Sequence, residues 1–299
     1  MAVNQQQFLK GLTTADRDYL TERTNWHASL RLSSLITLQA LCVLIIVNLW
    51  FLWPLAIVIL GLLLMCLFHL MHECTHATAF RSRRANRLIA FLCGLILFLP
   101  PEWFRYFHFA HHRYTQDPER DPELSIPKPQ TRMQWIFHIS GFGIWIASCK
   151  LFLRALAGRV DDDFIPLANR PSVCREIRLM LVFYLFIVAI SLATGSMIAV
   201  WVWIVPLLVG QPFLRLYLLA EHADCDETNN MFQNTRTVLT QPLIRWFTWN
   251  MPYHTAHHIY PAVPFHQLPA MHRRITGGIA YLSDGYIEFN HQYAGRFDA

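Results

Sequence analysis

Charge is scarce in this sequence. Asp, Glu, Lys and Arg make up 15% of its 299 residues, whereas a soluble domain carries about 25%. Hydrophobic residues reach 54%, and no charged residue occurs between positions 32 and 72 or between 179 and 214. This composition argues against an ordinary soluble protein and indicates an integral membrane protein.

Other familiar patterns are missing. The seven cysteines form no CxxC pair, and several lie inside apolar runs, where cysteine behaves as a small hydrophobe. We therefore expect reduced, structural cysteines; a metal-ligating Cys74 is the competing interpretation. The first twenty residues contain no apolar core after a basic start, so no cleaved signal peptide is expected.

The two uncharged runs predict four membrane-spanning helices. The 41 residues from 32 to 72 would extend roughly 60 Å as a helix, enough for about two crossings of a ~30 Å hydrocarbon core. Pro54 marks a turn in the first run and Thr194-Gly195-Ser196 a turn in the second. The predicted spans are 34–52, 54–72, 178–194 and 197–217. Two shorter uncharged stretches, 88–101 and 135–149, are expected to lie at the membrane surface.

The basic residues predict an orientation. In this arrangement all 25 Lys and Arg fall on one side of the membrane, and the two opposite turns carry none. Basic loops favour the cytoplasmic side. Both termini and the polar regions 73–177 and 218–299 should therefore be cytosolic, at the inner membrane if the protein is bacterial. A soluble protein with buried hairpins is the alternative, but such long uncharged runs would be hard to cover.

Eight of the fifteen histidines fall into three short motifs: HECTH at 72–76, HFAHH at 108–112 and HTAHH at 254–258. Residues three and four apart share one helical face, so each motif aims its imidazoles at a common point. The predicted topology brings all three to one cytosolic site. Eight imidazoles exceed what one four-coordinate zinc uses, which favours two metal ions. The candidate ligands are His72, His76, His108, His111, His112, His254, His257 and His258.

HECTH also matches the HExxH pattern of zinc proteases, with Glu73 as general base. A membrane zinc metalloprotease is therefore a different-class alternative. It would leave both HxxHH motifs unexplained. A non-enzymatic membrane protein that holds metal through its histidines is a further alternative.

The three motifs, in this order around two apolar hairpins, resemble the membrane fatty acid desaturase superfamily, which includes hydroxylases and carotenoid ketolases. The resemblance covers about residues 35–275. The segments 111–123 (HHRYTQDPERDPE) and 250–269 (NMPYHTAHHIYPAVPFHQLP) look like its acyl-lipid desaturase branch. It implies an all-α integral membrane fold in one domain, 1–299. Four transmembrane helices form two hairpins, with interfacial helices and a cytosolic histidine-rich cap that holds a di-metal site.

The resemblance also implies a further metal ligand between the last span and the third motif, and His222 stands at that place. Acyl-CoA desaturases of this superfamily carry an Asn four residues earlier. Here that position is Leu218, and the first motif is HxxxH rather than HxxxxH. Both departures favour an acyl-lipid enzyme.

The resemblance implies two iron ions as cofactors and O2 as co-substrate, because removing hydrogen from an unactivated alkyl chain needs a redox metal. The expected reaction is desaturation of an acyl chain of a membrane lipid. A hydroxylase or ketolase acting on a lipid, carotenoid or other apolar compound is the alternative. No HPGG haem segment, iron–sulfur cysteine pattern or Gly-rich dinucleotide loop is present. Electrons should therefore come from an external carrier, ferredoxin or cytochrome b5-like. No nucleic-acid partner is expected, and the oligomeric state is left open.

No catalytic residue is expected beyond the metal centre. Some carboxylates could accept hydrogen bonds from the far nitrogens of ligating imidazoles; the candidates are Glu73, Glu221, Asp117 and Asp121. A solvated loop is an equally open interpretation for residues 117–123. His69 is expected to pack beside the site rather than ligate metal. His266 and His272 are expected at the surface or beside the ligating imidazoles, and structural roles are expected for His27, His138 and His291.

Overall fold

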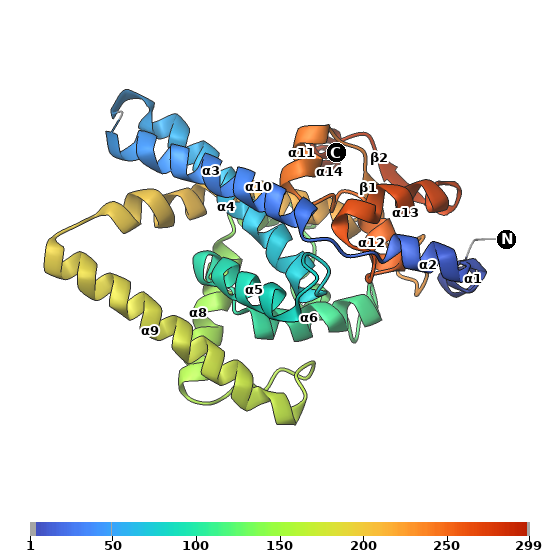
Figure 1. Ribbon diagram of the computed structural model, residues 1–299, viewed down its shortest axis with the longest axis horizontal. Coiled ribbons are helices and arrows are strands. Elements are labelled where there is room, and N and C mark those ends of the chain that lie inside the picture. Colours follow the sequence, from blue (N-terminus) through green and yellow to red (C-terminus); the bar gives the residue numbers. More distant parts are fainter. Residues whose placement is uncertain (1–3, 49, 298–299) are drawn as a thin grey trace.

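The computed structural model describes residues 4–48 and 50–297, so residue 49 of the first predicted span lies outside the description. Helices dominate (Figure 1). The four long apolar segments fold as α3 (Trp26–Asn48), α4 (Trp53–Thr75), α9 (Arg170–Thr194) and α10 (Val205–His222), the last preceded by a π-helical turn, η4 (Val200–Ile204).

The prediction of four long apolar helices is confirmed, and α3 packs against α4 as a hairpin. Within the described residues, four helices are long and apolar enough to cross a membrane. A short 3-10 turn, η1 (Trp50–Leu52), joins α3 to α4, and Gly195 ends α9 in the left-handed conformation, where glycine meets no steric penalty. In Figure 1 the α3–α4 and α9–α10 connections both lie on the left, away from α1 (Gln5–Gly11) and α14 (Tyr286–Gly295).

The helices extend beyond their predicted bounds at the ends that face the histidines. α3 begins eight residues before position 34, because the charged side chain of Arg31 near its start has hydrogen-bond partners in the fold. Arg31 Nη1 donates to the backbone oxygens of Arg245 and Trp246, 3.0 Å from each. α4 continues to Thr75 and α10 to His222. His222, expected after the last apolar helix, therefore lies on that helix, and His72 lies on α4 as predicted.

The inner helices α4 and α10 cross at two glycines. A Cβ atom on Gly61 would lie 2.5 Å from the Pro206 oxygen, and one on Gly210 would lie 2.4 Å from the Gly61 oxygen. Only glycine permits this backbone approach. The outer helices α3 and α9 have only 11% of their most apolar windows buried. Their apolar faces point away from the protein, as expected of helices surrounded by lipid.

The predicted surface stretches belong to two bent helix pairs. α5 (Arg83–Leu97) and α6 (Pro101–Tyr114) meet at 100°, and α7 (Arg132–Ile139) and α8 (Phe142–Leu156) meet at 55°. The sharp bend after α5 turns α6 beneath the end of α4. This bend carries the second histidine motif to the first.

The C-terminal region forms a cap at the end opposite the hairpin tips. It packs around the buried side chains of Phe232, Trp249 and Phe265. The remaining elements of this region are β1 (Arg236–Val238), α11 (Pro242–Phe247), α12 (His254–Ile259), η5 (Phe265–Gln267), α13 (Leu268–Ile275), η6 (Thr276–Gly278), β2 (Tyr281–Ser283) and α14 (Tyr286–Gly295). Between the hairpins lie η2 (Pro122–Ser125) and η3 (Leu167–Asn169).

The all-α expectation is incomplete in the cap. β1 and β2 pair in parallel, with Arg236 opposite Tyr281 and Val238 opposite Ser283. Each strand has only three residues, too short for an alternating pattern to be recognised in sequence.

The N-terminal helices α1 (Gln5–Gly11) and α2 (Thr14–Leu20) pack on the cap. Gln5 Nε2 donates to the Ile259 oxygen at 2.9 Å, and the Asp16 carboxylate pairs with Arg274 at 2.6 Å. A capping box between Thr13 and Asp16 starts α2. The beginning of the chain is thus tied to the helix that carries the third motif.

Candidate metal centre

Nine histidines from four segments meet where the ends of α4 and α10 reach the cap. His72 lies in the last turn of α4 and His76 caps it, while His222 is the last residue of α10. α6 and α12 supply the other six: His108, His111, His112, His254, His257 and His258. The structure thus brings together every histidine that the sequence predicted as a ligand.

The first group consists of His72, His76, His108, His112 and His257. One ring nitrogen of each lies within 4.8 Å of the corresponding nitrogens of the others. Neighbouring Nε2 atoms are 2.8 Å apart for His76 and His108, 2.9 Å for His108 and His112, and 3.0 Å for His112 and His257. Two imidazoles bound at right angles to one metal, about 2.1 Å from it, would place their nitrogens about 3.0 Å apart.

The second group contains His111, His222 and His258, whose ring nitrogens also lie within 4.8 Å of one another. His222 Nε2 is 3.2 Å from His111 Nε2 and 3.1 Å from His254 Nε2. His111, His222, His254 and His258 are all buried. The nine histidines therefore offer two adjacent sets of ligand atoms, in agreement with the two metal ions expected from the motifs.

Hydrogen-bond partners fix the protonation of the second group. His222 Nδ1 lies 3.0 Å from the Asn234 backbone oxygen, which can only accept, so this nitrogen carries the proton. His111 Nδ1 lies 3.0 Å from the Asp121 carboxylate. Its proton is therefore also on Nδ1, directed away from the centre.

His258 follows the same pattern. The Thr115 hydroxyl donates to the His111 oxygen at 2.7 Å, so it must accept from His258 Nδ1, which is 3.3 Å away. The Nε2 atom of His258 is buried without a hydrogen-bond partner. His222 and His258 thus direct Nε2 lone pairs at one point, which the Nε2 atom of His111 also faces. Lone pairs so close together repel unless a cation lies between them, and the residues present therefore fit a bound metal.

Burial keeps the third motif in its ligating form. It lowers the pKa of His254, His257 and His258 well below the ordinary range, and neighbouring histidines lower it further. These imidazoles are therefore neutral near pH 7, which is the state that binds metal.

Of the four carboxylates that the sequence analysis singled out, two contact an imidazole and two do not. Asp121 contacts His111, and Glu221 Oε1 lies 3.3 Å from His254 Nδ1. Glu73 and Asp117 lie elsewhere. The Glu73 carboxylate accepts from Thr78 Oγ1 and from the Phe265 amide, and Asp117 pairs with Arg120. Glu73 therefore joins the first motif to the loop after the third, with no role on an imidazole.

Sequence reasoning missed three partners of the imidazoles. Glu123 Oε2 lies 3.0 Å from His111 Nδ1, and the regular acidic spacing of residues 117–123 was the only signal for it. Thr115 and Asn234 complete the set. Asn234 acts through its backbone oxygen, and its side chain donates to the Thr115 oxygen at 3.2 Å. Because every residue type has a backbone oxygen, the sequence carries no signal for this contact.

The remaining histidines stay outside both groups. The ring of His69 packs 4.5 Å from Tyr217. His266 stacks on His27 with ring centres 4.6 Å apart. His138, His272 and His291 contribute no atom to either group, and Cys74 is buried as a free thiol.

Comparison with known proteins agrees with this geometry. The profile of the family described as fatty acid desaturase matches residues 48–290. Dihydrorhizobitoxine desaturase from Bradyrhizobium elkanii is 28% identical over 77% of this chain and 68% of its own length. The sphingolipid delta(4)-desaturase of Komagataella phaffii is 26% identical over 68% of this chain and 56% of its own. The fatty acid desaturase of Bacillus subtilis is 23% identical over 69% and 63%.

The chain thus spans between 56% and 68% of the length of these relatives. Their names share one reaction, desaturation, on different compounds. The family match covers all three histidine motifs, His222 and the long apolar helices α4, α9 and α10, and it begins at the last residue of α3. This chain belongs to the fatty acid desaturase family and is a desaturase-type oxidoreductase of the lipid-modifying kind.

Proposed function

We propose that the protein is a membrane-bound di-iron enzyme that uses O2 to desaturate an acyl chain of a membrane lipid. The observation that carries this proposal is the convergence of nine histidine rings into two adjacent groups at the ends of apolar helices. Two iron ions held there, together with O2, would supply the oxidising power that acids and bases lack. His72, His76, His108, His112 and His257 would hold one ion, and His111, His222, His254 and His258 the other.

The residues around the groups prepare them for this chemistry. Asp121, Thr115 and the Asn234 oxygen hold protons on the outer nitrogens and leave the inner lone pairs free. The buried setting limits access of water. His76 and His112 are the half-exposed members of the first group, so substrate would approach from their side, where the Phe109 ring lies 5.5 Å from His76.

The reaction balances only with an external reductant. Two hydrogens leave the alkyl chain, and O2 is reduced to two waters. This reduction also consumes two electrons and two protons from outside the substrate. We propose a ferredoxin or a cytochrome b5-like carrier as their source, docking on a cytosolic face that carries both termini and the metal centre. The whole chain would act as one domain.

A lipid substrate is supported by two features. α3 and α9 present apolar surfaces outward, so the metal groups lie close to where lipids would be. Two of the relatives are named for fatty acids or sphingolipids. Leu218, which stands where acyl-CoA desaturases carry an Asn, favours an acyl-lipid over an acyl-CoA.

One observation favours a second candidate, oxidation of a smaller compound. The relative from Bradyrhizobium elkanii is named for dihydrorhizobitoxine rather than for a fatty acid. A hydroxylase or ketolase would use the same histidines, since the reactions differ in the fate of the substrate radical. A zinc protease is disfavoured, because the Glu73 carboxylate, which would be its general base, is occupied by Thr78 and Phe265.

Metal and product analysis test the proposal together. Purified protein should contain two iron ions per chain, and cells that express it should gain an alkene in their lipids. Under 18O2 the product should carry no label. A labelled product would assign the protein to the oxygenating reactions. A single zinc ion, with activity that survives removal of O2, would refute the di-iron proposal.

A further inference from the structure

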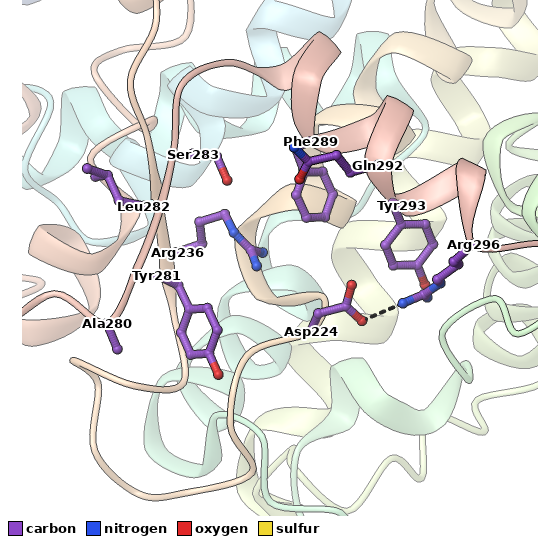
Figure 2. Close-up of a pocket in the computed structure, with 10 residues that line it drawn as sticks. All are labelled: Asp224, Arg236, Ala280, Tyr281, Leu282, Ser283, Phe289, Gln292, Tyr293 and Arg296. Carbon is purple, nitrogen blue, oxygen red and sulfur yellow. Dashed lines mark hydrogen bonds and ion pairs between the residues drawn. The ribbon is translucent and has the colours of Figure 1, made fainter.

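A polar cavity of about 270 Å³ lies in the cap, between the β1–β2 pair and α14 (Figure 2). It is separate from the histidine groups. Arg236 forms its centre in the figure, with Ser283 above it and Asp224 and Arg296 on the opposite wall.

The Arg236 side chain is held rigidly and is only 6% exposed. Its Nη1 donates to the oxygens of Ala220 and Ala223, at 3.2 Å and 2.6 Å. The guanidinium also lies over the rings of Phe289 and Tyr281, 4.6 Å and 5.4 Å from their centres. These contacts fix the direction in which the rest of the guanidinium points.

The charge of Arg236 is not neutralised. Among residues 4–48 and 50–297, no carboxylate lies within 4 Å of its nitrogens, and its Nε and Nη2 donate no hydrogen bond. The one carboxylate on the cavity wall, Asp224, pairs with Arg296 at 2.7 Å. The Tyr281 hydroxyl is bound to Asp226 at 2.6 Å. One net positive charge therefore remains inside the cavity.

A buried cation without a counter-ion is unfavourable. The free edge of a guanidinium presents two parallel N–H groups, which match two oxygens of a phosphate or a carboxylate. The Ser283 hydroxyl points into the same space (Figure 2) and offers a third donor from another direction. Donors on two sides suit a tetrahedral phosphate better than a planar carboxylate.

We propose that this cavity binds a phosphate group, either free or as a small monoester. The volume leaves room for a substituent of a few atoms beside the phosphate. The site also has a structural connection to the metal centre. The two oxygens held by Arg236 belong to Ala220 and Ala223, on either side of His222. An occupant would therefore stiffen the end of α10. The proposal does not depend on the reaction that the metal centre performs.

Isothermal titration of the purified, metal-loaded protein in non-ionic detergent tests the proposal. Inorganic phosphate and glycerol 3-phosphate are titrated at constant ionic strength, with chloride as the background anion. We expect saturable binding at one site per chain. Tighter binding of glycerol 3-phosphate would identify a phosphate ester, such as a lipid headgroup, as the ligand. Tighter binding of inorganic phosphate would identify the free anion.

Three variants locate the site. Ser283→Asp places a negative charge inside the cavity and should weaken binding at least tenfold. Arg236→Lys keeps the charge but removes the paired N–H groups, and it should also weaken binding at least tenfold. Ile287→Asp adds the same charge on α14 at a side chain that is 88% exposed and outside the cavity, and it should bind as the wild type does. Lack of saturable binding in the wild type, or unchanged affinity in a folded Ser283→Asp protein, would overturn the proposal.

Discussion

The Nε2 atoms of His111 and His222 lie 3.2 Å apart, and each ring has an acceptor for a proton on its other nitrogen. Each ring directs its proton outward, to Asp121 in one case and to the Asn234 oxygen in the other. His222 therefore presents an Nε2 lone pair to His111. A metal ion bound by both Nε2 atoms would suit this arrangement, and the first of the following predictions rests on this point.

Asp121→Asn should weaken metal binding in the second group. The substitution keeps the size of the side chain but removes the buried one of the two carboxylate charges, Asp121 and Glu123, that hold the His111 proton on Nδ1. Loss of such an outer partner typically costs 10- to 100-fold in metal affinity, so we expect about that range here. Titration of metal-free protein with Fe²⁺ measures it. Asp117→Asn is the matched control, because Asp117 lies in the same loop but pairs with Arg120; equal losses in both variants would contradict the assignment.

Gly210→Ala should destabilise the protein by about 1–3 kcal/mol, the usual cost of overpacking. The added methyl group would meet the Gly61 oxygen at 2.4 Å, and backbone cannot move aside cheaply. Thermal unfolding in detergent measures the effect, and iron content should fall with it. Gly11→Ala is the control, because α1 has open space at that position. A Gly210→Ala protein that melts like the wild type would show that the crossing tolerates a side chain.

Glu73→Leu should loosen the loop that follows the third motif. Leucine has a similar size but cannot accept, so the Phe265 amide would lose its acceptor in a buried place, whereas the Thr78 hydroxyl keeps the backbone oxygen of residue 73 at 3.0 Å. Each buried group left unpaired costs about 1–3 kcal/mol. Hydrogen exchange at the Phe265 amide should accelerate. Glu73→Gln retains an acceptor oxygen and should exchange close to the wild-type rate; fast exchange in both variants would point to the charge rather than to the hydrogen bonds.

Acid should destabilise the protein partly through His266. Burial and the neighbouring His27 lower its pKa to about 4, whereas an unfolded histidine titrates near pH 6.5. Between these values the unfolded chain takes up a proton that the folded chain refuses, so stability falls as the pH falls from about 6.5 toward about 4. His266→Phe keeps a flat ring against His27 but cannot be protonated. Its melting temperature should decline less with acid than that of the wild type.

His291→Phe provides the comparison for this measurement. His291 lies on the exposed side of α14, so its removal should leave the wild-type acid dependence intact. If His266→Phe and His291→Phe showed the same acid dependence, His266 would not contribute to the effect.

Residue spacing made much of the centre predictable. Imidazoles three or four residues apart share one face when a helix carries them, and the topology predicted from the uncharged runs put the three motifs on one side. The resemblance to desaturases added His222, a single histidine that belongs to none of the three spaced motifs. The structure shows why it belongs there: α10 does not end with the apolar run but continues through Glu221 to His222.

Other features depend on contacts that sequence patterns do not encode. The early start of α3 depends on Arg31 reaching two carbonyls more than 200 positions away. The outer partners of His222 and His258 are a backbone oxygen and a threonine hydroxyl. The β1–β2 pair and its cavity join residues 236 and 281, which only the folded cap brings together.

The nine histidines lie on four separate segments of the chain, and this has a consequence for biosynthesis. During translation, the chain up to residue 222 contains six of the nine histidines. Neither group is complete until α12 has left the ribosome and docked beside α6. Stable metal insertion must therefore follow synthesis of most of the cap. Because Gln5 of α1 donates to the Ile259 oxygen at the end of α12, α1 cannot complete its packing until the third motif has been made. Metal content would consequently measure how completely the cap has assembled.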